Sequence, residues 1–157
     1  HVLINRVQME QDNAKTILDK DGRLLIDYNR AGMPLLEIVT EPQYINPEDC
    51  QLVVKEMQEM LNTLGVSMAD LSQSTMRVDV NVSVHDSTSL LETPKIEIKS
   101  LCSTKNVERA IEYEYRRLVA ILEEGEEAQY ETRRYLPDQG ITKLLRSNPE
   151  KPDYRYF

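Results

Sequence analysis

The stretch 76–84 alternates apolar and polar side chains without a break, and this alternation limits the fold more than any other feature of the chain. Successive side chains of a β-strand point to opposite faces. One face of this strand therefore carries Met76, Val78, Val80, Val82 and Val84, and the other carries Arg77, Asp79, Asn81 and Ser83. Residues 95–101 repeat the pattern, with Ile96 and Ile98 opposite Lys95, Glu97 and Lys99. If the two strands pair, their sheet has one apolar face and one polar face.

Two helices are predicted to cover the apolar face. The first spans 47–64, with Asn46 as its N-cap, Pro47 in its first turn and Gly65 after its end. The second spans 104–124 and stops at Gly125. Its expected buried stripe, at helical spacing, is Val107, Ala110, Ile111, Tyr115, Leu118 and Leu122.

Further strands are predicted at 2–9, 23–28 and 35–40, with a turn at Asp21-Gly22 between the first two, and short strands and turns fill 128–157. This order predicts an α+β fold with a mostly antiparallel sheet and helices packed on one face. The length of 157 residues suggests a single domain. No apolar run reaches the about 18 residues of a membrane span, so none is expected.

A carboxylate interrupts the apolar strand predicted at 35–40. Glu37 lies between Leu36 and Ile38, and a buried carboxylate there must be paired, hydrogen-bonded, bound to a metal ion or neutralised by a raised pKa. The preceding loop contains Arg30, and a cation next to a carboxylate suits an anionic ligand together with a metal ion. The alternative is an edge strand with Glu37 in water.

The polar face of the 76–84 and 95–101 strands is either solvated or the floor of a site. Converging oxygens from Asp79, Glu37 and Glu10 would suit a hard cation such as Mg²⁺, whereas two histidines in the whole chain exclude a histidine-rich zinc site. Lys99, Arg77 and Arg30 would offset phosphate charge, although the chain contains no glycine-rich phosphate loop. The net charge of −8 argues against a nonspecific nucleic-acid surface.

Seven short motifs follow one another along the chain in a familiar order. They are Met9-Glu10-Gln11-Asp12, residues 27–42, residues 77–83, Ile96-Glu97-Ile98-Lys99, residues 110–114, Glu131-Thr132-Arg133-Arg134 and residues 153–157. With these motifs the chain resembles the GatB family of glutamyl-tRNA(Gln) amidotransferase subunits. The resemblance implies that 1–157 is part of a glutamine-synthetase-like catalytic domain. An N-terminal part and the C-terminal helical and tail domains that grip tRNA are expected to be absent.

The resemblance also implies an activity. The family forms a carbon–nitrogen bond: with ATP and Mg²⁺ it phosphorylates the glutamate of Glu-tRNA(Gln), then amidates it with ammonia that a partner amidase releases from glutamine. A small third subunit completes the complex, and the fragment alone is expected to be inactive. The implied catalytic residues are Glu10, Glu37, Asp79, Arg77 and Lys99; the implied cofactor-binding residues are Arg30, Glu97 and Lys99; and the implied metal ligands are Glu10, Gln11, Glu37 and Asp79.

The chain departs from the family pattern at several positions. Gln11 replaces a second carboxylate, Ser72-Gln73-Ser74 replaces an acidic run, and residues 99–103 read Lys-Ser-Leu-Cys-Ser. The low basicity and the missing carboxylates at 11, 72 and 73 favour a second hypothesis, a non-catalytic scaffold that docks the amidase in the same complex. The catalytic hypothesis is favoured more, by the retained residues Glu10, Glu37, Asp79, Arg77, Glu97 and Lys99. Gln11 and Val78 are more similar to organellar members, which predicts the mitochondrial matrix, with the bacterial cytoplasm as the alternative.

Overall fold

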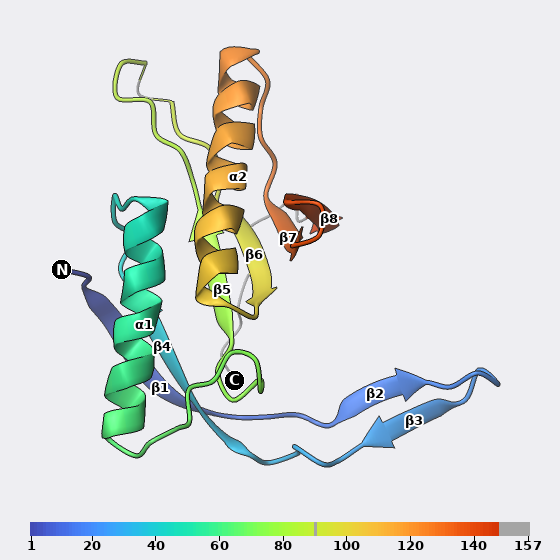
Figure 1. The fold of residues 1–157 in the computed structure, drawn as a ribbon. Coiled ribbons are helices and arrows are strands. Elements are labelled where there is room, and N and C mark those ends of the chain that lie inside the picture. The colour runs from blue at the N-terminus through green and yellow to red at the C-terminus, as the bar shows by residue number, and fades with distance from the viewer. Residues whose placement is uncertain (90, 148–157) are drawn as a thin grey trace. The chain divides into compact units, whose positions relative to one another are not determined.

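The computed structural model describes residues 1–89 and 91–147 (Figure 1). The motif at 153–157 lies outside these residues. Although the length predicts a single domain, the chain divides into two compact units, residues 1–44 and residues 45–157. They are called the N-terminal unit and the C-terminal unit below.

The N-terminal unit consists of two separate antiparallel strand pairs. β1 (Ile4–Gln11) pairs with β4 (Pro34–Thr40), and β2 (Lys15–Leu18) pairs with β3 (Leu24–Asp27). The predictions at 2–9, 23–28 and 35–40 correspond to β1, β3 and β4. β2 was missed because its four residues do not alternate. The Asp21-Gly22 turn therefore joins β2 to β3, and Gly22 supplies the positive φ of 76°.

The prediction that 35–40 is a buried strand was wrong. Among the described strands β4 pairs with β1 alone, so it is an edge strand, and none of its residues is buried. Its apolar residues serve a two-stranded sheet whose apolar face includes the register pairs Val7–Ile38 and Met9–Leu36.

The described part of the C-terminal unit is a four-stranded sheet with two helices. In chain order its elements are α1 (Pro47–Thr63), β5 (Val78–Val82), β6 (Ile96–Leu101), α2 (Thr104–Glu123), β7 (Glu131–Leu136) and β8 (Ile141–Ser147). The strand order is β5-β6-β7-β8. The β5–β6 pair is antiparallel as predicted, and the β7–β8 pair is antiparallel too. β6 and β7 are parallel. The helix α2 connects them and returns the chain to the end of the sheet at which β6 begins.

The core lies between the apolar face of this sheet and α2, which Figure 1 shows lying along β5 and β6. Ile96 and Ile98 are fully buried, and α1 adds Val54 while packing against α2. The fold is therefore α+β, as the sequence predicted. The predicted stripe of α2 was wrong at one position: Tyr115 is 52% exposed, and the buried position beside it belongs to Glu114.

Both helices begin at the predicted residues. Asn46 is the N-cap of α1, although its side chain makes no capping hydrogen bond, and Ser103 caps α2 by accepting from the Asn106 backbone N–H at 3.1 Å. Neither α1 nor α2, the helices of the described part, is long and apolar enough to cross a membrane.

Candidate functional site

The polar face of the β1–β4 sheet brings two of the predicted carboxylates together. Gln8 is in register with Glu37, and Glu10 follows two residues later on the same face of β1. The Gln8 side-chain Nε2 donates to Glu37 Oε2 at 2.6 Å and to Glu10 Oε1 at 3.1 Å. One amide thus holds both carboxylates. Together with Arg6, these side chains form what is called the Gln8 cluster below.

Arg6 provides the positive charge of the Gln8 cluster. Its Nε donates to Gln8 Oε1 at 3.1 Å, and its Nη2 lies 3.7 Å from Glu37 Oε2. The Glu37 side chain is 41% exposed, so it is both hydrogen-bonded and in contact with water. Two carboxylates against one guanidinium leave the cluster with a net negative charge. Sequence reasoning missed Arg6 and Gln8, although Arg6, Gln8 and Glu10 lie at every second position of one strand, which could have identified them.

The structure places two other predicted residues elsewhere in the N-terminal unit. Gln11 directly follows Glu10 and is in register with Pro34, so it points to the opposite face of the sheet. Arg30 lies in the β3–β4 loop, where its Nε is 2.8 Å from Asp12 Oδ2. This ion pair ties the loop to the end of β1.

The polar face of the β5–β6 pair contains a second charged group. Lys99 Nζ lies 2.8 Å from Glu97 Oε1 and 3.5 Å from Asp79 Oδ2, and Glu97 Oε2 accepts from Thr132 Oγ1 at 3.1 Å. These four residues are called the Lys99 cluster below. Partial burial by itself lowers the pKa of Lys99, but the hydrogen bond to Glu97 and the charges of Asp79 and Glu97 outweigh it. The net effect raises the pKa, so Lys99 stays a cation at neutral pH.

A β-bulge in β6 places Lys99 next to these carboxylates. Val78 is in register with Leu101 and Val80 with Ile98, so two residues, Lys99 and Ser100, face Asp79 alone. Ser100 adopts a φ of 59°, a left-handed conformation that costs a non-glycine residue about 1–2 kcal/mol. The Asp79 carboxylate offsets this cost by accepting from the Ser100 backbone N–H at 2.8 Å.

Arg77, the last predicted site residue, directly precedes β5 and is exposed. Glu37 and Asp79, which the sequence predicts to share a site, belong to different units. In neither unit do three or more His, Cys, Asp or Glu side chains of the described residues gather as a metal-binding group.

The donor set of the Gln8 cluster fits Mg²⁺. This ion keeps several waters and uses one or two protein carboxylates together with phosphate oxygens of a substrate. Glu10 and Glu37 are such a pair, oriented by Gln8 and open to water. The Lys99 cluster fits a cation less well, because the ammonium group already lies between its two carboxylates.

A buried ion-pair network lies between α2 and the β7–β8 pair. Glu114 is fully buried, with Oε2 2.8 Å from Arg117 Nε and Oε1 3.0 Å from Arg133 Nε, and it also accepts from Thr142 Oγ1. Glu131 Oε2 binds the same two guanidinium groups at 3.2 and 2.6 Å. Sequence reasoning missed this network. The spacing of position 114 from Val107, Ile111 and Leu118 was the available signal.

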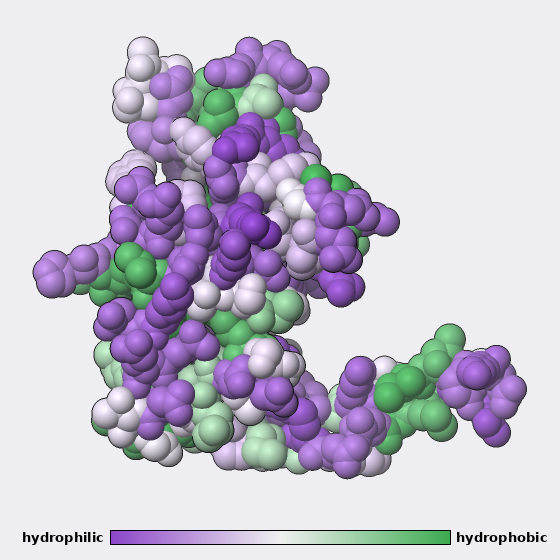
Figure 2. All heavy atoms as spheres, viewed as in Figure 1, coloured by the Kyte–Doolittle hydropathy of each residue, from purple (hydrophilic) through white to green (hydrophobic). Residues whose placement is uncertain are grey.

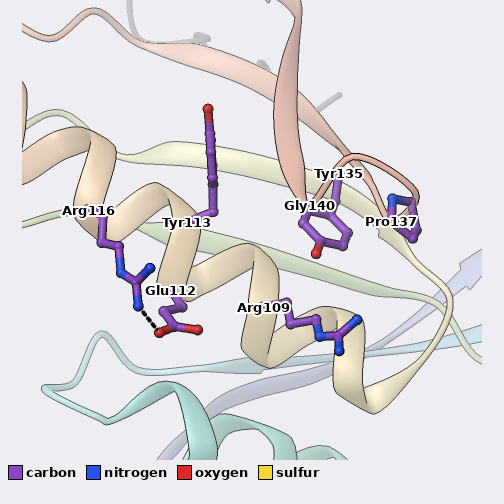
Figure 3. A pocket seen from close by; sticks show the side chains of 7 residues that line it. All are labelled: Arg109, Glu112, Tyr113, Arg116, Tyr135, Pro137 and Gly140. Atoms are coloured by element: carbon purple, nitrogen blue, oxygen red, sulfur yellow. Dashed lines mark hydrogen bonds and ion pairs between the residues drawn. The ribbon is translucent and has the colours of Figure 1, made fainter.

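A cavity of about 230 Å³ opens between α2 and the β7–β8 turn (Figure 3). It is lined by Arg109, Glu112, Tyr113, Arg116, Tyr135, Pro137 and Gly140. Glu112 forms an ion pair with Arg116, which offsets the positive charge of that side. None of the predicted site residues lines this cavity, so it is separate from both clusters.

Comparison with known proteins places the chain in a family. Residues 1–157 match the family described as the GatB/GatE catalytic domain. The chain is 44% identical over 156 residues to the GatB subunit of the aspartyl/glutamyl-tRNA(Asn/Gln) amidotransferase of Thermus thermophilus, an alignment that covers 99% of this chain and 33% of that protein. For the proteins of the same name from Thermodesulfovibrio yellowstonii and Thermotoga maritima, with the same coverage, the identities are 40% and 37%. The chain belongs to the GatB/GatE catalytic domain family.

The chain spans about a third of the length of these curated relatives. The family match and these relatives confirm the resemblance that was inferred from the motifs. The relatives come from bacteria, so they give no support to the mitochondrial location expected from Gln11 and Val78.

Proposed function

We propose that the protein to which this chain belongs is a subunit of a tRNA-dependent amidotransferase that activates the glutamate of Glu-tRNA(Gln) with ATP and amidates it. The support is the name shared by relatives that match 99% of the chain, together with the carboxylate pair that Gln8 holds. The ammonia would come from a partner amidase subunit, with a small third subunit in the same complex.

The chemistry requires activation because a carboxylate is a poor electrophile toward ammonia. An oxygen of the glutamate carboxylate attacks the γ-phosphorus of ATP, ADP leaves, and an acyl phosphate forms. Ammonia then attacks the carbonyl carbon, the carbon–oxygen bond to phosphate breaks, and the nitrogen loses a proton to give the amide. The protein contributes positioning and charge stabilisation to both steps.

The Gln8 cluster carries this proposal. Glu10 and Glu37 would hold Mg²⁺, and the bound ion would offset the negative charge of the ATP phosphate oxygens. Gln8 keeps both carboxylates in place through its amide N–H groups, and Arg6 restrains Glu37. Gln11 is omitted from the ligand set because it points to the other face of the sheet.

Positive charge for phosphate oxygens would come from Arg30 in the N-terminal unit and from Lys99 and Arg77 in the C-terminal unit. Glu97 and Asp79 position the Lys99 ammonium group and keep it protonated. Asp79 Oδ1 is engaged by the Ser100 N–H, so we assign Asp79 to this positioning role instead of to the metal.

The test uses the full-length subunit in its complex with Glu37→Gln and Glu10→Gln. Each change removes one negative charge from the Gln8 cluster while keeping the size of the side chain. We expect ATP-dependent amidation of Glu-tRNA(Gln) to fall by roughly 10²–10³-fold, with glutaminase activity of the partner still measurable and Mg²⁺ binding by calorimetry weakened. The matched control is Glu56→Gln on the exposed side of α1.

Normal ADP release by both variants would overturn the assignment of the Gln8 cluster. If the variants lost co-purification of the amidase and kept full turnover in the surviving complex, the scaffold hypothesis would replace the catalytic one.

A further inference from the structure

Most apolar side chains of the β2–β3 hairpin are exposed to solvent. No third strand of the described residues pairs with it. Five large apolar residues on its two strands are each 40–68% exposed: Ile17, Leu18, Leu24, Leu25 and Ile26. Figure 2 shows them as a green stem that ends in a purple tip. An isolated two-stranded hairpin is at best marginally stable in water, and a contiguous exposed apolar patch indicates an interaction site.

Both faces of the hairpin are apolar. The register pairs Ile17 with Leu25 on one face and Leu18 with Leu24 on the other, where Ile26 continues the row. An antiparallel sheet at a protein surface normally has one apolar and one polar face. A flat partner surface would cover only one of these faces, whereas a groove covers both.

The tip of the hairpin is charged, and its charged side chains are hydrogen-bonded. Asp19 Oδ1 accepts from the backbone N–H of Asp21 at 2.9 Å and of Arg23 at 2.8 Å, and Arg23 Nε donates to Asp19 Oδ2 at 2.7 Å. The backbone hydrogen bond from Arg23, followed by its side-chain bond, lowers the pKa of Asp19. The tip therefore stays ionised and belongs in water, while the stem belongs in an apolar environment.

The charges of the hairpin select the kind of partner. Asp19 and Asp21 balance Lys20 and Arg23, so the tip has no net positive charge to attract an anionic membrane or an RNA backbone. The apolar stem is aliphatic and offers no aromatic platform for bases. A protein groove with apolar walls remains, and the relatives carry the name of one subunit of a complex.

We propose that residues 15–27 form an arm that inserts its apolar stem between the walls of a groove on another protein subunit of the amidotransferase, with the charged tip in water beyond the groove. This inference rests on the subunit membership stated in the proposed function. It adds an assembly element that the catalytic clusters do not include.

The test changes one residue on each face of the stem in the full-length subunit. Leu18→Ser and Leu25→Ser, each alone, are expected to weaken association with the co-expressed amidase and third subunit by at least about tenfold, because each exchanges a buried leucine for a polar side chain. Lys20→Ser at the exposed tip is the control and should leave the affinity within about twofold. Hydrogen exchange of the amides of 15–27 should slow on assembly. The stem positions are exposed, so circular dichroism of the free variants should be unchanged.

Each other occupant predicts a different result. If the amides of 15–27 are already protected from hydrogen exchange in the free subunit, the rest of its own chain covers the hairpin. If the free subunit is a dimer that Leu25→Ser dissociates, a second copy covers it. Binding to phosphatidylglycerol vesicles through the same leucines would show a membrane. Sensitivity to only one of the two serine variants would contradict a groove. Assembly is measured here without turnover, so a failure of Glu37→Gln to lower amidation leaves this result readable by itself.

Discussion

At the scale of single residues, Asp79 shows how one carboxylate combines a structural and an electrostatic role. Oδ1 accepts from the strained Ser100 N–H, and Oδ2 lies 3.5 Å from the Lys99 ammonium group. The sequence alternation predicted only that Asp79 lies on the polar face. Because the bulge adds a residue opposite Asp79, one carboxylate reaches both a backbone donor and a cation.

Two variants of Asp79 separate these roles. Asp79→Asn keeps a side-chain oxygen that can accept from Ser100, whereas Asp79→Ala removes it. Asp79→Ala is expected to lower the free energy of unfolding by about 1 kcal/mol, discounted for the 45% exposure of the side chain, and Asp79→Asn by less than half of that. Urea unfolding measures both values.

Amidation by the complete enzyme then decides what the charge does. If the charge positions Lys99, both variants lose activity. If Asp79→Asn retained wild-type activity, Asp79 would serve the bulge alone.

At the scale of elements, the buried network joins α2 to β7 and β8. A buried carboxylate without partners is costly, but Glu114 binds two guanidinium groups and a hydroxyl, and Glu131 binds the same guanidinium groups. The network is thus complete, and removing one member exposes the others to an apolar environment without compensation. The network holds β7 against α2, the helix that precedes it in the chain.

Glu114→Gln should therefore destabilise the chain by about 3 kcal/mol, since it leaves Arg117 and Arg133 with one carboxylate instead of two. The control is Glu112→Gln on the same helix, whose ion pair with Arg116 is at the surface and is worth about 0–1 kcal/mol. Urea denaturation followed by circular dichroism compares the two variants. Equal losses would mean that Glu114 contributes no more than a surface ion pair.

At the scale of the whole molecule, apolar burial is distributed very unevenly. Every buried residue among those described belongs to the C-terminal unit, whereas the N-terminal unit consists of two exposed strand pairs. The unit that contains the Gln8 cluster thus lacks a core of its own. Its stability in the chain depends on strand hydrogen bonds that water can reach.

Native-state hydrogen exchange should reveal this difference. In the 157-residue chain, amides of β6 and α2 should exchange only through global unfolding, and amides of β2 and β3 through local opening, with protection factors lower by at least about 10²-fold. Mass spectrometry of peptides from 15–27 and 96–123 gives the comparison. Equal protection in both would contradict the division into a cored and an uncored unit.

The sequence alone determined the features that depend on local periodicity. Alternation over 76–84 and 95–101 predicted the β5–β6 pair and its apolar face, and helical spacing with Gly65 and Gly125 predicted both helices nearly to their ends. These signals are readable because a strand or a helix repeats its contacts every two or about 3.6 residues. The prediction that Glu10 and Glu37 join the sheet of Asp79 was wrong, because β1 and β4 form a separate two-stranded sheet.

Tertiary structure decided which charged side chains find partners far away in the sequence. Only the pairing of β1 with β4 brings Glu37 to Gln8 and Glu10, because the Gln8–Glu37 hydrogen bond joins residues 29 positions apart. Only the meeting of α2 with β7 and β8 makes burial of Glu114 favourable, since its partner Thr142 lies 28 positions further along the chain. Local pattern reports which face a side chain occupies, and long-range pairing supplies the partners that allow a charge to stay there.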